Sequence, residues 1–201
     1  MSRVLGLLAA AVLVLSGCSA APYVPPGEAR IDVDTPQLRR AKDAAGVDDC
    51  PTGGDRAVNT ALPPIVLPCL GGGPDVPLAY LRGPMVVSFW ASWCQPCRQE
   101  MPVFQKFHER YGDRVSVLGI DYQDAQPAAA LELVAETGAT YPQLADPGGD
   151  LNGEAPLPRL RGMPFLVLIG SDGRIAHLRF GELEDLPQLT ALVEEHLEVS
   201  L

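Results

Sequence analysis

The sequence has 201 residues, of which 47% are apolar and 20% are charged, and its formal net charge at pH 7 is -10. This length suits one buried domain with appendages and is too short for two domains of ordinary size. The acidic balance, together with the lack of any basic run that could neutralise phosphates, argues against a nucleic-acid partner.

The first 20 residues, MSRVLGLLAAAVLVLSGCSA, have the pattern of an export signal. An early arginine precedes an apolar run that is short for a membrane span and ends in small residues. The ending Leu15-Ser16-Gly17-Cys18 resembles the bacterial lipobox, in which the cysteine becomes the lipidated first residue. We therefore expect a signal peptide and a lipid anchor at Cys18 on the extracytoplasmic face of the membrane. An ordinary cleaved signal or an uncleaved anchor is the alternative.

The next segment is rich in proline and small residues and has no periodicity, which predicts a flexible tether. Thr35 and Pro36 are typical of a helix N-terminus, so a short helix is expected up to about Ala45, where Gly46 would end it.

The sequence contains five cysteines in all, namely Cys18, Cys50, Cys69, Cys94 and Cys97. The lipid would take the first, and the last two form a local pair. Thiols outside the cytosol are generally oxidised, so Cys50 and Cys69 are expected to form a disulfide that closes a loop of about 20 residues and contributes on the order of 3 kcal/mol. This bond is interpreted as a structural staple without a catalytic part. The expected organisation is a signal peptide, a tether, a helical extension with the staple and one globular domain, over residues 1–17, 18–35, 36–62 and 63–201.

Hydrophobic periodicity then predicts the elements of the globular domain. A hairpin is expected within residues 62–83, ahead of the main sheet. Beyond it the pattern predicts, in chain order, a strand at 85–91, a helix at 95–112, a strand at 114–121, a helix at 126–138, a hairpin of strands at 165–169 and 174–180, and a closing helix at 186–197. This order indicates an α/β fold with one central sheet and helices on both sides.

Cys94 and Cys97 lie two residues apart where the first buried strand gives way to a helix. Residues three apart at a helix start share one face, at a separation that allows a disulfide to open and close without moving the fold. Cys94, at the cap, would meet unpaired N–H groups that favour its thiolate, so it should attack and Cys97 should resolve. A zinc site would need Cys50 and Cys69 as further ligands, and none of the three histidines has ligand spacing to another, so no metal is expected. A purely structural Cys94–Cys97 bond is the other alternative, although closing so short a loop gains little stability.

The stretch FWASWCQPCRQEMP, followed at a distance by GMPFLVLIGSDGRI, resembles the thioredoxin superfamily and in particular its exported TlpA/ResA/DsbE-like branch. The resemblance runs from about residue 63 to residue 197. It implies a thioredoxin-like fold with a central mixed sheet flanked by helices, an N-terminal strand addition and a central helix insertion. It also implies thiol–disulfide exchange without an organic cofactor.

Site residues carried over by this resemblance are Cys94 as nucleophile and Cys97 as resolving cysteine. Met163 and Pro164 correspond to a loop with a cis-proline that lies against the cysteines and binds an extended substrate. Trp93, beside the nucleophile, is expected to shape the docking surface.

Glu100 corresponds to an acid that this branch keeps near the cysteine pair, where a carboxyl group could carry protons during exchange. The alternative is a glutamate that only favours the helix N-terminal half. Ser88 stands where thioredoxin has a buried aspartate, which would move proton handling to Glu100 or water. Residues 146–162, with several glycines and prolines, replace a short helix of the family and border the expected partner groove.

The function implied is that of a membrane-tethered reductant of exported protein disulfides, such as those of apocytochrome c, supplied with electrons by an integral membrane donor. The alternative is the reverse chemistry, an extracytoplasmic oxidant that installs disulfides. A peroxiredoxin-like peroxidase is a further alternative, although its usual threonine three residues before the reactive cysteine is Ala91 here. A binding lipoprotein that uses the fold only as a scaffold is the non-enzymatic alternative.

Overall fold

The computed structural model describes residues 31–52 and 62–201. The predicted signal peptide, Cys18 and most of the predicted tether lie outside the described residues. The helices are α1 Pro36–Ala45, the short 3-10 helix η1 Leu78–Tyr80, α2 Gln95–Tyr111, α3 Pro127–Thr137 and α4 Leu186–Leu197. The strands are β1 Val66–Leu67, β2 Val76–Pro77, β3 Met85–Trp90, β4 Ser116–Tyr122, β5 Gln143–Asp146, β6 Phe165–Ile169 and β7 Ile175–Phe180.

A mixed five-stranded sheet forms the centre of the molecule, in the order β5-β4-β3-β6-β7. Strands β3, β4 and β5 are parallel, whereas β6 is antiparallel to both β3 and β7. Strand β3 lies in the middle and is buried along its whole length. The expected thioredoxin-like α/β fold is therefore confirmed, with the β1–β2 hairpin as the N-terminal addition and α3 as the inserted helix.

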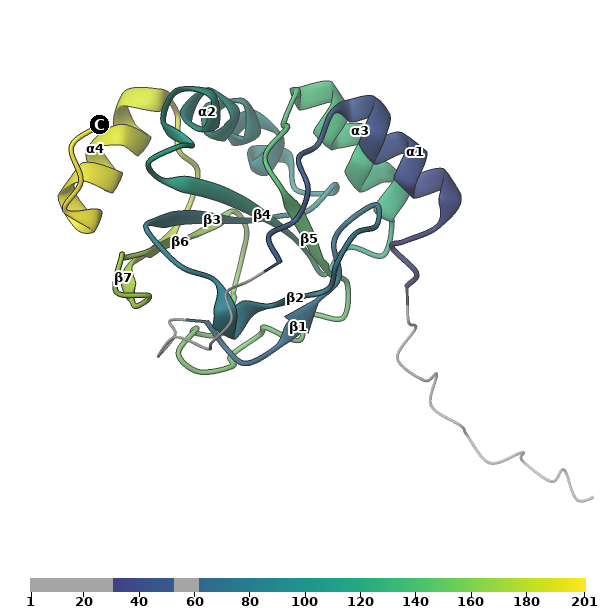
Figure 1. Cartoon of the computed structure of the whole chain (residues 1–201), viewed down its shortest axis with the longest axis horizontal. Coiled ribbons are helices and arrows are strands. Elements are labelled where there is room, and N and C mark those ends of the chain that lie inside the picture. The colour runs from purple at the N-terminus through teal and green to yellow at the C-terminus, as the bar shows by residue number, and fades with distance from the viewer. Residues whose placement is uncertain (1–30, 53–61) are drawn as a thin grey trace, which may run out of the picture.

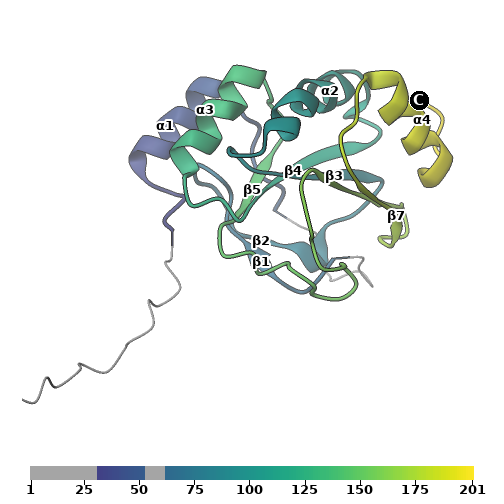
Figure 2. The ribbon, with the colours of Figure 1, turned by 180° about the vertical axis from the view of Figure 1, so that it is seen from behind.

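The two faces of this sheet are covered differently, and here the expectation of helices on both sides is wrong. In the described part of the chain, α1, α2, α3 and α4 all lie along one face, and the β1–β2 hairpin and the loop before β6 lie along the other (Figures 1 and 2). Two apolar clusters fill the layers, one with residues of the four helices and one with residues of the hairpin and the loop. Gly153, Pro156 and Pro158 disfavour a helix in that loop, so buried leucines such as Leu151 and Leu157 cover the sheet instead.

Helix α1 forms as predicted and belongs to the main core. The Thr35 hydroxyl accepts a hydrogen bond from the Leu38 N–H, and Gly46 ends the helix in the left-handed conformation. Leu38 is buried in the helix-side cluster. Val33, predicted within the tether, is also buried, and its carbonyl accepts a hydrogen bond from the Gly71 N–H at 2.9 Å. The packed part of the chain therefore begins ahead of residue 36.

Strand β5 at the sheet edge is the one element of the sheet that the sequence pattern did not predict. It has four residues, Gln143–Asp146, all of them buried, and two of them are polar. Its outer edge is covered by the β1–β2 hairpin. The Leu70 N–H donates a hydrogen bond to the Gln143 carbonyl, and the Ala145 N–H donates one to the Pro68 carbonyl. So short a strand carries too few residues to show a period of two.

The described helices include none that is long and apolar enough to cross a membrane.

Candidate active site

The Cys94–Cys97 pair lies where the central strand passes into the longest helix. After β3 the chain turns through Ala91, whose carbonyl accepts a hydrogen bond from the Cys94 N–H at 3.0 Å. Cys94 is the N-cap of α2, and its Sγ accepts a hydrogen bond from the Cys97 N–H at 3.2 Å. Pro96 occupies the first turn, where its missing N–H has no partner to lose.

In the structure Cys94 and Cys97 form a disulfide with a Cα–Cα distance of 5.3 Å. Both side chains are buried, Cys97 more completely than Cys94. The cap position places Cys94 at the positive end of the helix dipole, beside N–H groups without helical partners, and such surroundings favour a thiolate. The arrangement therefore suits Cys94 as the attacking sulfur.

The sheet register brings two loops to the same edge as this pair. Trp90, the last residue of β3, is the Cα partner of Asp121 in β4, while Phe89 pairs with Phe165 in β6. The segment after β4 therefore lies on one side of the cysteines, and Pro164, immediately before β6, lies on the other. The chain reverses direction between β3 and β6, so this convergence follows from the topology.

Met163 and Pro164 are joined by a cis peptide bond, as the resemblance implied. Met163 is half-buried and packs against the apolar cluster that contains both active-site cysteines. The Pro164 carbonyl accepts a hydrogen bond from the Gly181 N–H at 3.0 Å, which ties the loop to the end of β7. The loop before β6 is thus fixed beside the cysteine pair.

A cavity of about 680 Å³ opens along this loop. Its lining includes Met163 and Pro164 and also Arg159, Arg161 and Phe180. Phe180 is an exposed aromatic side chain, and the two arginines are exposed as well. The groove therefore combines apolar surface with positive charge in a protein that is acidic overall. Neither Trp93 nor the cysteines belong to this lining.

Trp93 lies on the opposite side of the cysteine pair, toward β4. Its side chain is 57% exposed, and its Nε1 donates a hydrogen bond to the Gln123 carbonyl at 3.2 Å. Asp124 accepts a hydrogen bond from the Ser92 N–H at 2.7 Å, which fixes the residue two before Cys94. Asp124 was not among the residues predicted from sequence.

Glu100 lies one turn after Cys97 on the same face of α2. Its side chain is only 2% exposed, and one carboxyl oxygen accepts a hydrogen bond from the Leu183 N–H at 3.1 Å. Burial away from water raises the pKa of Glu100 to about 8, against the smaller lowering effect of the Leu183 hydrogen bond. The carboxyl group therefore titrates close to the pH range in which thiols titrate.

A second buried acid near the site was missed from the sequence. Asp121 lies at the carboxyl end of β4, and burial, with a smaller contribution from the charge of Asp124, raises its pKa well above the usual range. One of its oxygens has no hydrogen-bond partner within the described residues. The signal available was the run Asp121 to Asp124 directly after a parallel strand, because the carboxyl ends of parallel strands meet at one sheet edge.

Cys50 and Cys69 are also joined, with a Cα–Cα distance of 6.0 Å. Cys69 lies in the β1–β2 hairpin, where it forms an isolated bridge with Leu144 of β5. The two cysteine pairs are thus separate disulfides, and the four sulfurs do not gather at one point. In the described part of the chain, no group of three or more histidine, cysteine or acidic side chains is arranged to hold a metal ion.

The fold, the disulfide of CxxC spacing at the start of a helix and the cis-proline loop opposite it place the protein in the thioredoxin-like class. The chain belongs to the AhpC/TSA family, which matches residues 54–178. A "Thioredoxin" of Mycolicibacterium smegmatis is 32% identical over 103 residues, which cover 51% of this chain and 77% of that protein.

The "Thiol:disulfide interchange protein CycY" of Rhizobium leguminosarum bv. viciae is 33% identical over 117 residues, which cover 57% of this chain and 60% of that protein. The chain spans less than two thirds of the length of several curated relatives that it matches, CycY among them. A crystal structure described as a putative thiol:disulfide interchange protein DsbE from Chlorobium tepidum superposes with a TM-score of 0.54 at 27% identity, covering 73% of this chain and 99% of that one.

Proposed function

We propose that the protein is a thiol–disulfide oxidoreductase in which Cys94 attacks and Cys97 resolves. The observation that carries this proposal is the Cys94–Cys97 disulfide at the positive end of α2. The names of several relatives, which are thiol:disulfide interchange proteins, support the same reaction.

In the reductive direction, the Cys94 thiolate attacks a disulfide of the substrate, which forms a mixed disulfide and releases one substrate thiolate. Cys97 then loses its proton and attacks Cys94, which forms the internal disulfide and frees the second substrate thiolate. A carboxyl group with a pKa of about 8 exchanges protons with a thiol at little free-energy cost, so Glu100 is suited to accept the proton of Cys97.

The substrate would lie between Trp93 on one side of Cys94 and the Met163–Pro164 loop on the other. Trp93 offers an exposed aromatic face, and the groove beside the loop offers apolar and positively charged surface. An extended segment that pairs with the loop backbone would place its disulfide over Cys94.

The proposed setting is the extracytoplasmic face of the membrane, with the chain anchored by lipid at Cys18. The lipobox-like sequence and the resemblance to exported oxidoreductases support this setting. The proposed substrates are disulfides of exported proteins such as apocytochrome c, and the proposed electron donor is an integral membrane thiol–disulfide protein.

Substrate trapping tests the assigned roles. The Cys97→Ser variant keeps the attacking thiol and loses the resolving one, so we expect it to accumulate mixed disulfides with exported proteins, seen as bands that a reductant abolishes. The Cys94→Ser variant is the matched control and should trap none. Equal trapping by both variants would contradict the assigned roles of the two cysteines. A cellular phenotype that survives Cys94→Ser unchanged would favour a binding module over an exchanger.

The peroxidase alternative is tested in the same preparation. Ala91, three residues before Cys94, is buried and has no hydroxyl to orient a peroxide. We expect no consumption of hydrogen peroxide beyond the rate of an ordinary thiol. Rapid, Cys94-dependent consumption would instead identify a peroxidase.

A further inference from the structure

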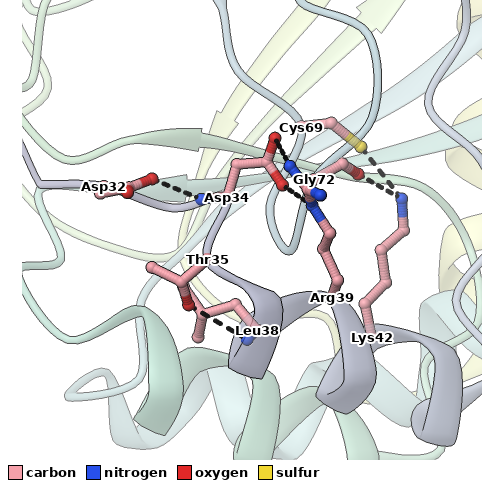
Figure 3. Close-up of polar contacts among 8 residues, drawn as sticks. All are labelled: Asp32, Asp34, Thr35, Leu38, Arg39, Lys42, Cys69 and Gly72. Carbon is pink, nitrogen blue, oxygen red and sulfur yellow. Dashed lines mark hydrogen bonds and ion pairs between the residues drawn. The ribbon is translucent and has the colours of Figure 1, made fainter.

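Lys42 is a buried lysine whose ammonium group lies against the second disulfide. Its side chain is 5% exposed and reaches from α1 to the β1–β2 hairpin, as Figure 3 shows. The Nζ donates hydrogen bonds to the Gly72 carbonyl at 2.8 Å and to Cys69 Sγ at 3.3 Å. A disulfide sulfur is a weak acceptor, so the bonded form of Cys69 satisfies this ammonium poorly.

No carboxylate of the described residues lies within ion-pair distance of Lys42. Asp34 is engaged by Arg39, with distances of 2.6 Å and 3.0 Å to the two guanidinium nitrogens (Figure 3). The hydrogen bond from Arg39 is the main cause that lowers the pKa of Asp34, and Lys42 contributes only at longer range. A buried ammonium without an anionic partner is costly, because burial removes its hydration.

The conformation of the hairpin turn brings its backbone close to this ammonium group. Gly71, Gly72 and Gly73 all have positive φ values, of 77°, 90° and 131°. A Cβ atom on Gly73 would lie 3.3 Å from Cys69 Sγ and 3.6 Å from the Lys42 Nζ. Side chains at these positions would therefore open the close contact between the turn, the lysine and the sulfur.

The other sulfur also has a partner suited to its reduced form. Cys50 Sγ lies 3.3 Å from the Gln143 carbonyl, a position in which a thiol could donate a hydrogen bond but a disulfide sulfur cannot. From these contacts we infer that Cys50–Cys69 is a second exchangeable disulfide, reduced by dithiols, with Cys69 leaving as a thiolate paired to Lys42. This inference adds a redox role to the structural disulfide expected from sequence, and it does not depend on the function proposed for Cys94.

In the first step, a thiolate of the dithiol attacks Cys50 Sγ. The Cys50–Cys69 bond breaks, a mixed disulfide forms at Cys50, and the electron pair of the broken bond leaves on Cys69 beside Lys42. The second thiolate of the reductant then displaces Cys50, which takes up a proton from water. The reductant departs as a disulfide after giving up two electrons to the protein and two protons to the solvent, so the protein gains two electrons and the one proton on Cys50.

Both cysteines are buried, and the small difference in their exposure has the same direction as the proposed order of attack. Cys50 is 4% exposed and Cys69 is 1% exposed. Both chain neighbours of Cys50, Asp49 and Pro51, line a cavity of about 230 Å³ that opens to solvent. Cys69 lies under the hairpin turn and the Lys42 side chain.

The first test is a redox titration of the full chain in graded ratios of reduced to oxidised dithiothreitol, with acid quenching, alkylation and mass spectrometry of the Cys50 and Cys69 peptides. We expect Lys42→Met to need a ratio about tenfold higher than the wild type for half reduction, because it removes the partner of the thiolate. Arg40→Met, which removes an exposed charge from the same helix, should stay within about twofold. Equal midpoints for Lys42→Met and the wild type would overturn the inference.

The second test needs no variant, so it holds even if Lys42→Met fails to fold. The folded wild-type protein is exposed briefly to reduced glutathione, quenched with acid and alkylated. We expect glutathione on Cys50 and an alkylated, free Cys69. An adduct on Cys69, or a bond that reacts only after the far-ultraviolet circular dichroism of the fold is lost, would contradict the inference.

Discussion

Glu100 illustrates how one buried side chain couples chemistry to stability. Its neighbours provide a single backbone hydrogen bond, from Leu183, and no cation among the described residues forms an ion pair with it. Burial raises the pKa of Glu100 to about 8, so the protonated form is favoured in the folded protein at neutral pH. Under the proposed function, Glu100 must lose this proton before it can accept the proton of Cys97.

The first prediction concerns the pH dependence of stability. The folded pKa of Glu100, about 8, lies above its ordinary value of 4.5, so its stabilising contribution is complete below pH 4.5 and is lost as pH rises through 8. Relative to Glu100→Gln, the wild type should lose on the order of 3 to 5 kcal/mol of unfolding free energy between pH 4.5 and pH 9. Urea unfolding of both oxidised proteins measures this difference, and parallel pH curves would refute it.

The second prediction concerns Asp124. Asp124→Ala removes the acceptor for the Ser92 N–H and loosens the turn that positions Cys94. The second-order rate constant with which the reduced protein cleaves a small aromatic disulfide should fall about tenfold.

Asp172→Ala is the matched control for Asp124→Ala. Asp172 accepts a hydrogen bond from the backbone two residues on, as Asp124 does from Gln126, but it lies in the turn between β6 and β7. Its rate constant should match the wild type within about twofold. A similar loss in both variants would show that the effect of Asp124→Ala is not specific to the turn before Cys94.

Residues of the site differ in how far sequence could predict them. Cys94 and Cys97 form a local motif, and the resemblance placed Pro164 in its cis loop. Asp124 and Lys42 could not be found in this way, because their partners Ser92 and Cys69 are distant in sequence and are brought together only by the sheet and the hairpin.

Among the elements, those with clear terminal signals were predicted most accurately. Helices α1 and α3 end at Gly46 and Gly138, both in the left-handed conformation that glycine favours. Strand β5 was missed because its four residues mix Gln143 and Asp146 with two apolar ones. Tertiary partners, and not the local pattern, bury these polar side chains.

Strand β4 offers a prediction at the scale of elements. Trp90 of β3 donates a hydrogen bond from Nε1 to Gln143 Oε1 of β5 at 2.9 Å, and this contact passes over Gly119 of the strand between them. A Cβ atom at Gly119 would overlap Gln143 Oε1 and lie 2.9 Å from Trp90 Nε1.

Gly119→Ala should therefore destabilise the protein by about 2 to 3 kcal/mol and change the near-ultraviolet circular dichroism of Trp90. Ser116→Ala, at the exposed start of the same strand, should change the unfolding free energy by less than about 0.5 kcal/mol. An unchanged urea midpoint for Gly119→Ala would show that the three-strand contact can rearrange freely.

At the scale of the whole molecule, the uneven covering of the sheet explains where the groove lies. Four helices fill one face, and a helix-poor loop rich in glycine and proline covers the other and leads into the cis-proline (Figure 1). The period of each segment predicted this set of helices. Periodicity could not predict that all four helices lie on one face of the sheet, because this depends on the loop before β6 taking the place of a helix on the other face.

The two disulfides of the described chain occupy different places in this architecture. Cys94–Cys97 lies at the sheet edge between two converging loops, and Cys50–Cys69 joins the N-terminal extension to the hairpin beside β5. The first lies where the proposed substrate would bind, and the second joins two segments of the N-terminal part of the described chain.

The reduction potential of Cys94–Cys97 tests the proposed function most directly, measured by equilibrating the protein with graded dithiothreitol mixtures and counting alkylated Cys94. A reductant of exported proteins should have a potential near that of thioredoxin, about −270 mV. A potential near that of DsbA, about −120 mV, would contradict a reductive role and assign the protein to disulfide formation.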